Sequence, residues 1–97
     1  MLENLTLDVF TNHLNTTFRF QYEKATQEFE LIEAKDMGST PKLKQFSILF
    51  RGPSEPIFNQ GMCPFEHDEL GAVPLFIVPV GQDEEGVYYE VVFSRLV

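Results

Sequence analysis

The feature that most constrains the fold of this chain is the segment 72–97, which runs AVPLFIVPVG, then QDEEG, then VYYEVVFSRLV. Two runs rich in β-branched and aromatic residues flank a short acidic turn that ends in glycine. This is the composition of a β-hairpin that is buried on at least one side. We therefore expect the most apolar surface of the chain in paired strands, over Leu75–Val80 and Tyr88–Ser94, rather than in a helix or a membrane span.

Earlier segments alternate apolar and polar residues, as half-buried strands do. Ile32 breaks this alternation, which indicates either a bulge or a strand that is covered on both sides near its end. Pro64, which has no amide hydrogen, weakens its strand or places it at an edge. The further strands that we expect are Thr16–Tyr22, Gln27–Ala34, Lys44–Arg51 and Gly61–Glu66. The residues expected to face inward from them are Phe18, Phe20, Tyr22, Phe29, Leu31, Phe46, Ile48, Phe50, Cys63 and Phe65.

One short helix is predicted near the start of the chain, over Thr6–Leu14. Thr6 is a suitable N-cap, and Asn15 can adopt the left-handed conformation that ends a helix. Two turns of helix are marginal alone, so this helix must pack against the strands. The apolar stripe with which it would pack consists of Leu7, Phe10 and Leu14.

These elements predict a mainly β fold with one short N-terminal helix. About six short strands joined by tight loops favour a small antiparallel meander, which forms a closed or partly open barrel or a two-layer sandwich. The 97 residues suffice for one small core, so residues 1–97 are expected to form a single domain.

Composition excludes several classes of function. The net charge of −8 would repel a polyanion, so we expect no binding to nucleic acid. The longest apolar run, Val73–Val80, is far too short to span a membrane. The first residues lack the basic start and long apolar core of an export signal, and Cys63 is the only cysteine, which excludes a disulfide within the chain. We therefore expect a cytoplasmic protein.

The densest polar cluster is Glu66, His67, Asp68 and Glu69. Adjacent side chains of a strand point to opposite faces, so these four cannot converge on one metal ion or substrate without partners from elsewhere. We expect a turn in which Asp68 accepts hydrogen bonds from backbone amides. His13 is expected to lie half exposed at the end of the helix, where the dipole favours it.

We consequently predict no enzyme, no cofactor and no catalytic or metal-binding residue. A structural or protein-interaction module is expected instead, as a homo-oligomer or in complex with another protein. The residues expected to contribute an interaction surface are Glu66, His67, Asp68, Glu69 and Tyr88.

The strand edges bear on this expectation, since an exposed edge either pairs with a partner or is blocked by charge and proline. Glu28 and Glu30 are expected to block the second strand. The sixth strand is apolar on both faces, so it is central or covered by a second chain. The alternative is a small barrel that binds an apolar or aromatic ligand among Phe18, Phe20, Phe46, Phe50 and Tyr89.

Three stretches spread over nearly the whole chain, LTLDVFTNHLNTTF, FSILFRGP and FEHDELGAVPLFIVPVG, resemble an uncharacterised family of short bacterial domains. Genes of this family are often neighbours of genes for phage-tail-collar or microcystin-dependent-type proteins. The resemblance therefore implies an accessory part in a phage-tail-like assembly, into whose particle the protein would be incorporated. It carries no catalytic residue over to this chain.

Overall fold

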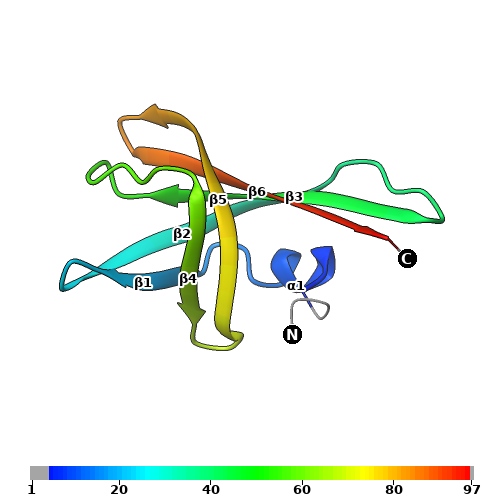
Figure 1. Cartoon of the computed structure of the whole chain (residues 1–97), viewed down its shortest axis with the longest axis horizontal. Coiled ribbons are helices and arrows are strands. Elements are labelled where there is room, and N and C mark those ends of the chain that lie inside the picture. Colours follow the sequence, from blue (N-terminus) through cyan, green and yellow to red (C-terminus); the bar gives the residue numbers. More distant parts are fainter. Residues whose placement is uncertain (1–4, 97) are drawn as a thin grey trace.

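The computed structural model describes residues 5–96, which form one helix and six strands (Figure 1). All strand pairs are antiparallel. The predicted fold class, mainly β with one short N-terminal helix, is confirmed. The elements are α1 Leu7–Thr11, β1 Thr17–Tyr22, β2 Ala25–Asp36, β3 Leu43–Gly52, β4 Gly61–His67, β5 Gly71–Asp83 and β6 Gly86–Leu96.

The strands ring one core in the order β1-β2-β3-β6-β5-β4, without forming a regular barrel. The order differs from one sequential meander, because β3 pairs with β6 and not with β4. The β3–β4 connection, residues 53–60, contains Pro53 and Pro56 and is too long for a tight hairpin. The ring closes where β1 meets β4, at the single register pair Arg19 and Glu66.

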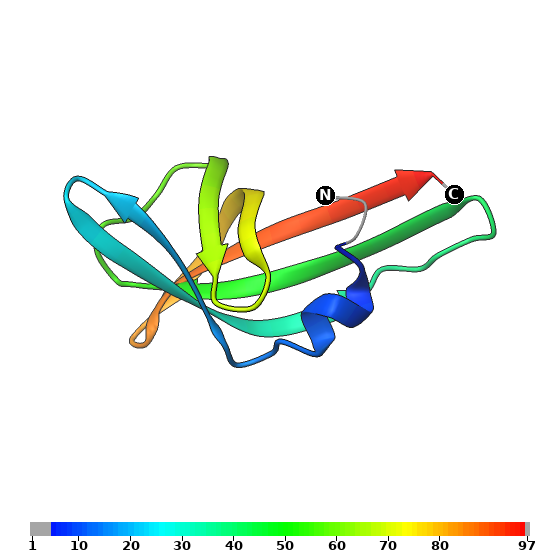
Figure 2. The same ribbon diagram turned by 90° about the horizontal axis from the view of Figure 1, so that it is seen from below.

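The longest pairing joins β3 and β6, from Leu43 opposite Leu96 to Gly52 opposite Val87. Both strands extend past their other neighbours, as Figures 1 and 2 show. We call this end of the strand pair the ribbon; it consists of residues 43–47 and 92–96, of which Phe46 and Ser47 still pair with β2. It makes the molecule elongated, with extents of 43 × 27 × 22 Å.

Alternate residues of every strand face inward and form one aromatic core. Phe50 stacks on Phe65 with ring centroids 5.1 Å apart, and Phe29 lies 5.0 Å from Tyr89. Gly52 is the residue that lets these rings approach the backbone, since a Cβ there would lie 2.9 Å from the Phe29 ring. All five aromatic side chains that were considered as the lining of a ligand cavity are buried in this core: Phe18, Phe20, Phe46, Phe50 and Tyr89.

Helix α1 is shorter than predicted, because the chain leaves the helix at Asn12 and continues as a turn. The N-cap is confirmed, with Thr6 Oγ1 accepting a hydrogen bond from the amide of Val9 at 3.3 Å. Asn15 has the predicted left-handed conformation, with φ of 66°. Phe10 is fully buried and anchors the helix over the ribbon. This five-residue helix is too short to cross a membrane, and no longer apolar helix occurs within residues 5–96.

Two predictions about strand edges have different outcomes. The bulge at Ile32 is confirmed by a register shift between Leu31 and Glu33. The blocking role of Glu28 and Glu30 is wrong, since β2 lies between β1 and β3 and has no free edge there. These carboxylates instead face basic residues of the neighbouring strands, Arg19 in the register of β1 and Arg51 in an ion pair from β3.

Candidate functional site

The residues predicted to form one interaction surface lie at two separate places. Glu66–Glu69 form the end of β4 and the turn that leads into β5. Tyr88 lies on β6, opposite Gly81 near the far end of β5. Its hydroxyl donates a hydrogen bond to Asp83 at 2.7 Å, and this contact raises the pKa of Tyr88 and lowers that of Asp83. The length of β5 separates the two groups.

His67 is the buried member of the first group. Its side chain points inward because it continues the alternation of Cys63 and Phe65 along β4, and only 5% of the residue is exposed. Its Nδ1 accepts hydrogen bonds from the backbone amides of Glu69 at 3.0 Å and Leu70 at 3.2 Å. The imidazole therefore caps the β4–β5 turn from inside the ring.

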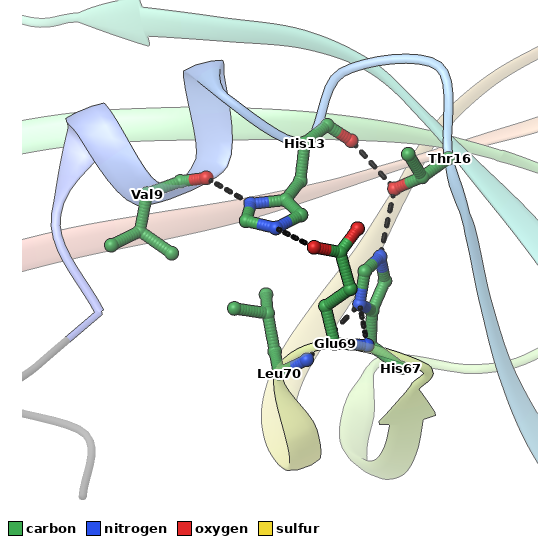
Figure 3. A network of polar contacts seen from close by, with 6 residues as sticks. All are labelled: Val9, His13, Thr16, His67, Glu69 and Leu70. Atoms are coloured by element: carbon green, nitrogen blue, oxygen red, sulfur yellow. Dashed lines mark hydrogen bonds and ion pairs between the residues drawn. The ribbon is translucent and has the colours of Figure 1, made fainter.

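The other ring nitrogen ties this turn to the start of β1 (Figure 3). His67 Nε2 lies 2.9 Å from Thr16 Oγ1, which in turn lies 2.6 Å from the carbonyl oxygen of His13. The Thr16 hydroxyl has one hydrogen and donates it to that carbonyl. Nε2 must then carry the imidazole hydrogen and donate it to Thr16, which leaves Nδ1 as an acceptor. The network thus requires the neutral, Nε2-protonated ring.

The second histidine contacts the first. His13 Nδ1 lies 2.7 Å from the carbonyl oxygen of Val9, so the predicted place at the helix end is confirmed. Its ring stands edge-on to His67 with centroids 5.1 Å apart, and its Nε2 lies 3.8 Å from the carboxylate of Glu69. The proximity of the two histidines could not be predicted from their spacing, because it depends on how the ring closes.

The surroundings of His67 lower its pKa below the ordinary value. Burial is the largest cause, and the charges of His13 and Arg19 act in the same direction, whereas Glu69 and Asp68 oppose them. The geometry agrees, because a proton on Nδ1 would face the two amide hydrogens that this atom accepts. A protonated imidazole would therefore release the β4–β5 turn.

The prediction for Asp68 is wrong. It accepts a hydrogen bond from Arg19 Nη2 at 2.6 Å instead of capping the turn. The turn amides are already bonded to His67, and the ring closure brings β1 beside the turn, so that Arg19 is the available partner. Glu66, exposed on the outer face, lies opposite the same Arg19 in the register of the closure. These polar residues thus join β1 and β4, the first and last strands in the strand order.

This cluster is built to hold the fold together. The hydrogen bonds of His67 to Thr16 and of Arg19 to Asp68 join the β4–β5 turn to β1 and the segment before it, and within residues 5–96 no group of three His, Cys, Asp or Glu side chains is placed to hold a metal ion. Cys63 is buried, which raises the pKa of its thiol to about 11. At neutral pH almost none of it is the nucleophilic thiolate.

A second feature, which was not predicted, is the outer edge of the ribbon. The first part of β5, residues 71–77, pairs with β4, and β5 pairs with β6 only over Val78–Asp83. The part of β6 beyond Glu90 consequently has β3 on one side and, among the described strands, none on the other (Figure 2). Val92 is 54% exposed there and Leu96 is 82% exposed.

The backbone groups at this edge follow from the register. The amide of Met37 donates a hydrogen bond to the carbonyl of Gln45. In this part of β3, therefore, the backbone N–H and C=O groups of odd-numbered residues point to β2, and those of even-numbered residues point to β6. Phe46 pairs with Phe93, whose backbone therefore faces β3. The backbone groups of the alternate β6 residues point to the open edge: Val92, Ser94 and Leu96.

The sequence holds a signal for this edge. The segment VVFSRL, residues 91–96, contains no acidic residue, proline or glycine, although the chain has 15 acidic residues. It thus lacks the acidic residues and the proline that often block an edge strand, and Arg95 is its one charged residue. The prediction was that β6 is central or covered by a second chain. β6 is central up to Glu90, where β3 and β5 flank it, whereas beyond Glu90 no described strand lies on its outer side, and covering by a second chain stays a prediction there.

Comparison with known families finds a match over residues 5–93 to a family described as Domain of unknown function (DUF6916). No curated protein and no solved structure matches the chain.

Proposed function

We propose that this chain, which belongs to the DUF6916 family, is a non-enzymatic protein-interaction module that binds a protein partner along the open edge of β6. The observation that carries the proposal is that no described strand pairs with β6 at Val92, Ser94 and Leu96 on the side away from β3, beside two exposed apolar side chains. An extended segment of a partner can add to such an edge as a further strand, with main-chain hydrogen bonds supplying affinity.

The distribution of charge favours a protein over a nucleic acid as partner. Arg19 pairs with Asp68, and Arg51 pairs with Glu30 and lies 3.8 Å from Glu85. These cations are neutralised within the chain, whose net charge is −8. A phosphate backbone would need a row of basic residues to release its counterions.

The internal packing favours an interaction module over a ligand-binding barrel. Phe18 lies 5.1 Å from Phe50, and Phe20 lies 5.4 Å from Phe65, measured between ring centroids. Side chains in mutual contact fill the interior of a small ring of strands, as the size of such a ring requires. We therefore place the function on the outside of the molecule.

The setting that we propose is a phage-tail-like assembly of a bacterium, to which the chain is an accessory. This part rests on the family resemblance and its implied gene neighbourhood. In this setting the protein is made in the cytoplasm and becomes part of the particle there.

The test is co-expression with the tail-collar-type protein encoded beside the gene, followed by size-exclusion chromatography of the purified mixture. We expect the two proteins to elute together. Val92→Lys should abolish co-elution, because it places a charge on the edge. Val80→Lys is the matched control, since Val80 is also 54% exposed but lies on β5. Separate elution, or equal loss with both variants, would contradict the proposal.

A further inference from the structure

We infer that the open edge of β6 takes a second copy of this chain, whose own β6 pairs with it antiparallel across a two-fold axis at Ser94. The inference rests on the proposed function: in the isolated protein a second copy occupies the edge that the neighbouring gene product would take in the assembly, so the two compete for it. Two copies joined in this way form a continuous sheet through both ribbons. Such an interface is isologous, so the same residues serve on both sides.

The position of the axis follows from the backbone. A two-fold axis perpendicular to the sheet keeps the inner faces of both copies on the same side. Even-numbered residues of one copy must then lie opposite even-numbered residues of the other, and odd-numbered opposite odd-numbered. The groups that point outward belong to Val92, Ser94 and Leu96. With Ser94 opposite itself, Val92 of each copy lies opposite Leu96 of the other. All three residues then make ladder hydrogen bonds.

This register also suits the side chains. Val92 of each copy covers Leu96 of the other, so the dimer contains two such apolar pairs. The exposed apolar side chains of one copy are thus matched by those of the second copy. On the inner face, Arg95 lies opposite Phe93 of the second copy, so no two like charges meet. Ser94 is small and exposed, as a residue at the axis must be.

The helix leaves the edge accessible. α1 packs over β2 and β3, and its Phe10 reaches across to the ring of Phe93, 5.4 Å away, on the inner face. Figure 2 shows α1 on the β3 side of the ribbon and the outer edge of β6 on the opposite side. Arg95 of β6 donates a hydrogen bond to the carbonyl oxygen of Leu5, 3.3 Å away, so the segment before α1 also reaches β6. Among the described strands none pairs with the outer edge, where a second strand can approach in the plane of the sheet.

The expected dimer is weak and depends on salt in a definite direction. A single strand pair buries well below the roughly 1,600 Å² of a standard interface, so association should vary with concentration. Each copy carries a net charge of −8. Added salt screens this repulsion and should strengthen the dimer, whereas a contact driven by opposite charges would weaken.

The test combines mass measurement with a cross-link. Sedimentation equilibrium of the full chain should show a mass that rises toward twice 11.2 kDa with concentration. Val92→Lys should remain a monomer, and Val80→Lys should dimerise like the wild type. Ser94→Cys should form an intermolecular disulfide on mild oxidation. The Cα atoms of a directly opposed hydrogen-bonded pair are about 5.5 Å apart, within the range that a disulfide bridges.

Glu90→Cys is the control for the cross-link, because its two copies would lie far from the axis. The native Cys63 is buried and does not compete. A monomer at all concentrations, a dimer that survives Val92→Lys, or equal cross-linking of both cysteine variants would overturn the inference. If the chain is a monomer but still binds the neighbouring gene product through Val92, the proposed function stands and the self-pairing fails. If neither association occurs, both fail.

Discussion

Acid should weaken this fold at a pH where its carboxylates are still ionised, and His67 should be the cause. The folded chain holds the imidazole neutral, because Nδ1 accepts two amide hydrogens and burial lowers the pKa of the ring. In the unfolded chain the imidazole has an ordinary pKa near 6.5. As the pH falls through 6.5, the unfolded state takes up a proton that the folded state does not. The contribution of the neutral His67 to the free energy of unfolding is therefore fully present above pH 6.5 and is lost progressively below it.

The size of the effect follows from one proton. The free energy of unfolding should fall by up to about 1.4 kcal/mol per pH unit between pH 6.5 and the lowered pKa of the folded state. For a domain of this size that corresponds to roughly 5–10 °C in melting temperature per pH unit. Carboxylates such as Asp83, whose pKa is lowered in the fold, add their loss only in stronger acid.

The perturbation is His67→Phe, which keeps a ring beside Phe18 but cannot accept or donate a hydrogen bond. It leaves the part-buried amide of Leu70 without a partner, and we expect a loss of about 1.5–2.5 kcal/mol at pH 7.5, after a partial offset from the more apolar ring. Thermal melts by circular dichroism between pH 7.5 and 5.5 should then be flat for the variant and sloped for the wild type. His13→Gln should keep most of the slope. Equal slopes for His67→Phe and wild type would refute the assignment.

Three further substitutions or reactions test the core. Gly52→Ala should lower the free energy of unfolding by about 1–3 kcal/mol in urea titrations, because its Cβ would overlap the core rings. Gly61→Ala is the control and should change this free energy little, since nothing lies within 4 Å of its Cβ position. A larger loss with Gly61→Ala than with Gly52→Ala would refute the packing. Cys63 should react with a thiol reagent at pH 8 only after denaturation, since burial raises its pKa to about 11, and rapid labelling of the native chain would be inconsistent with this. Tyr89→Phe removes the acceptor of the Phe58 amide, 2.8 Å away, and should cost about 1 kcal/mol by the same urea measurement; an unchanged midpoint would speak against that bond.

The local elements could be predicted because they depend on short-range periodicity. Alternation located the earlier strands, runs of β-branched and aromatic residues located the last two, and the break at Ile32 located the bulge. The ends were less accurate: β5 runs over Gly71–Asp83 rather than Leu75–Val80. Its first part pairs with β4 and its second part with β6, and these two ladders extend the strand through residues with low strand propensity. Pro64 illustrates the same competition, because it lies opposite Pro74 in an otherwise complete ladder.

The strand order and the contents of the polar cluster could not be predicted, because both depend on contacts between distant residues. Nothing local indicates that β3 pairs with β6, or that Thr16 bonds to His67 across 51 residues. The errors for Asp68 and Glu30 share this cause: each carboxylate found a basic partner on a strand that only the closed ring brings near. The open edge of β6 likewise depends on where β5 leaves it.

The most direct test of the proposed pairing is amide hydrogen exchange along β6, measured by NMR over a dilution series. The amides of Val91, Phe93 and Arg95 face β3 and should be protected at every concentration. Those of Val92, Ser94 and Leu96 should be protected at high concentration and should exchange rapidly on dilution. If the exchange rates of these three edge amides do not change with concentration, no second copy pairs there and the claim is contradicted.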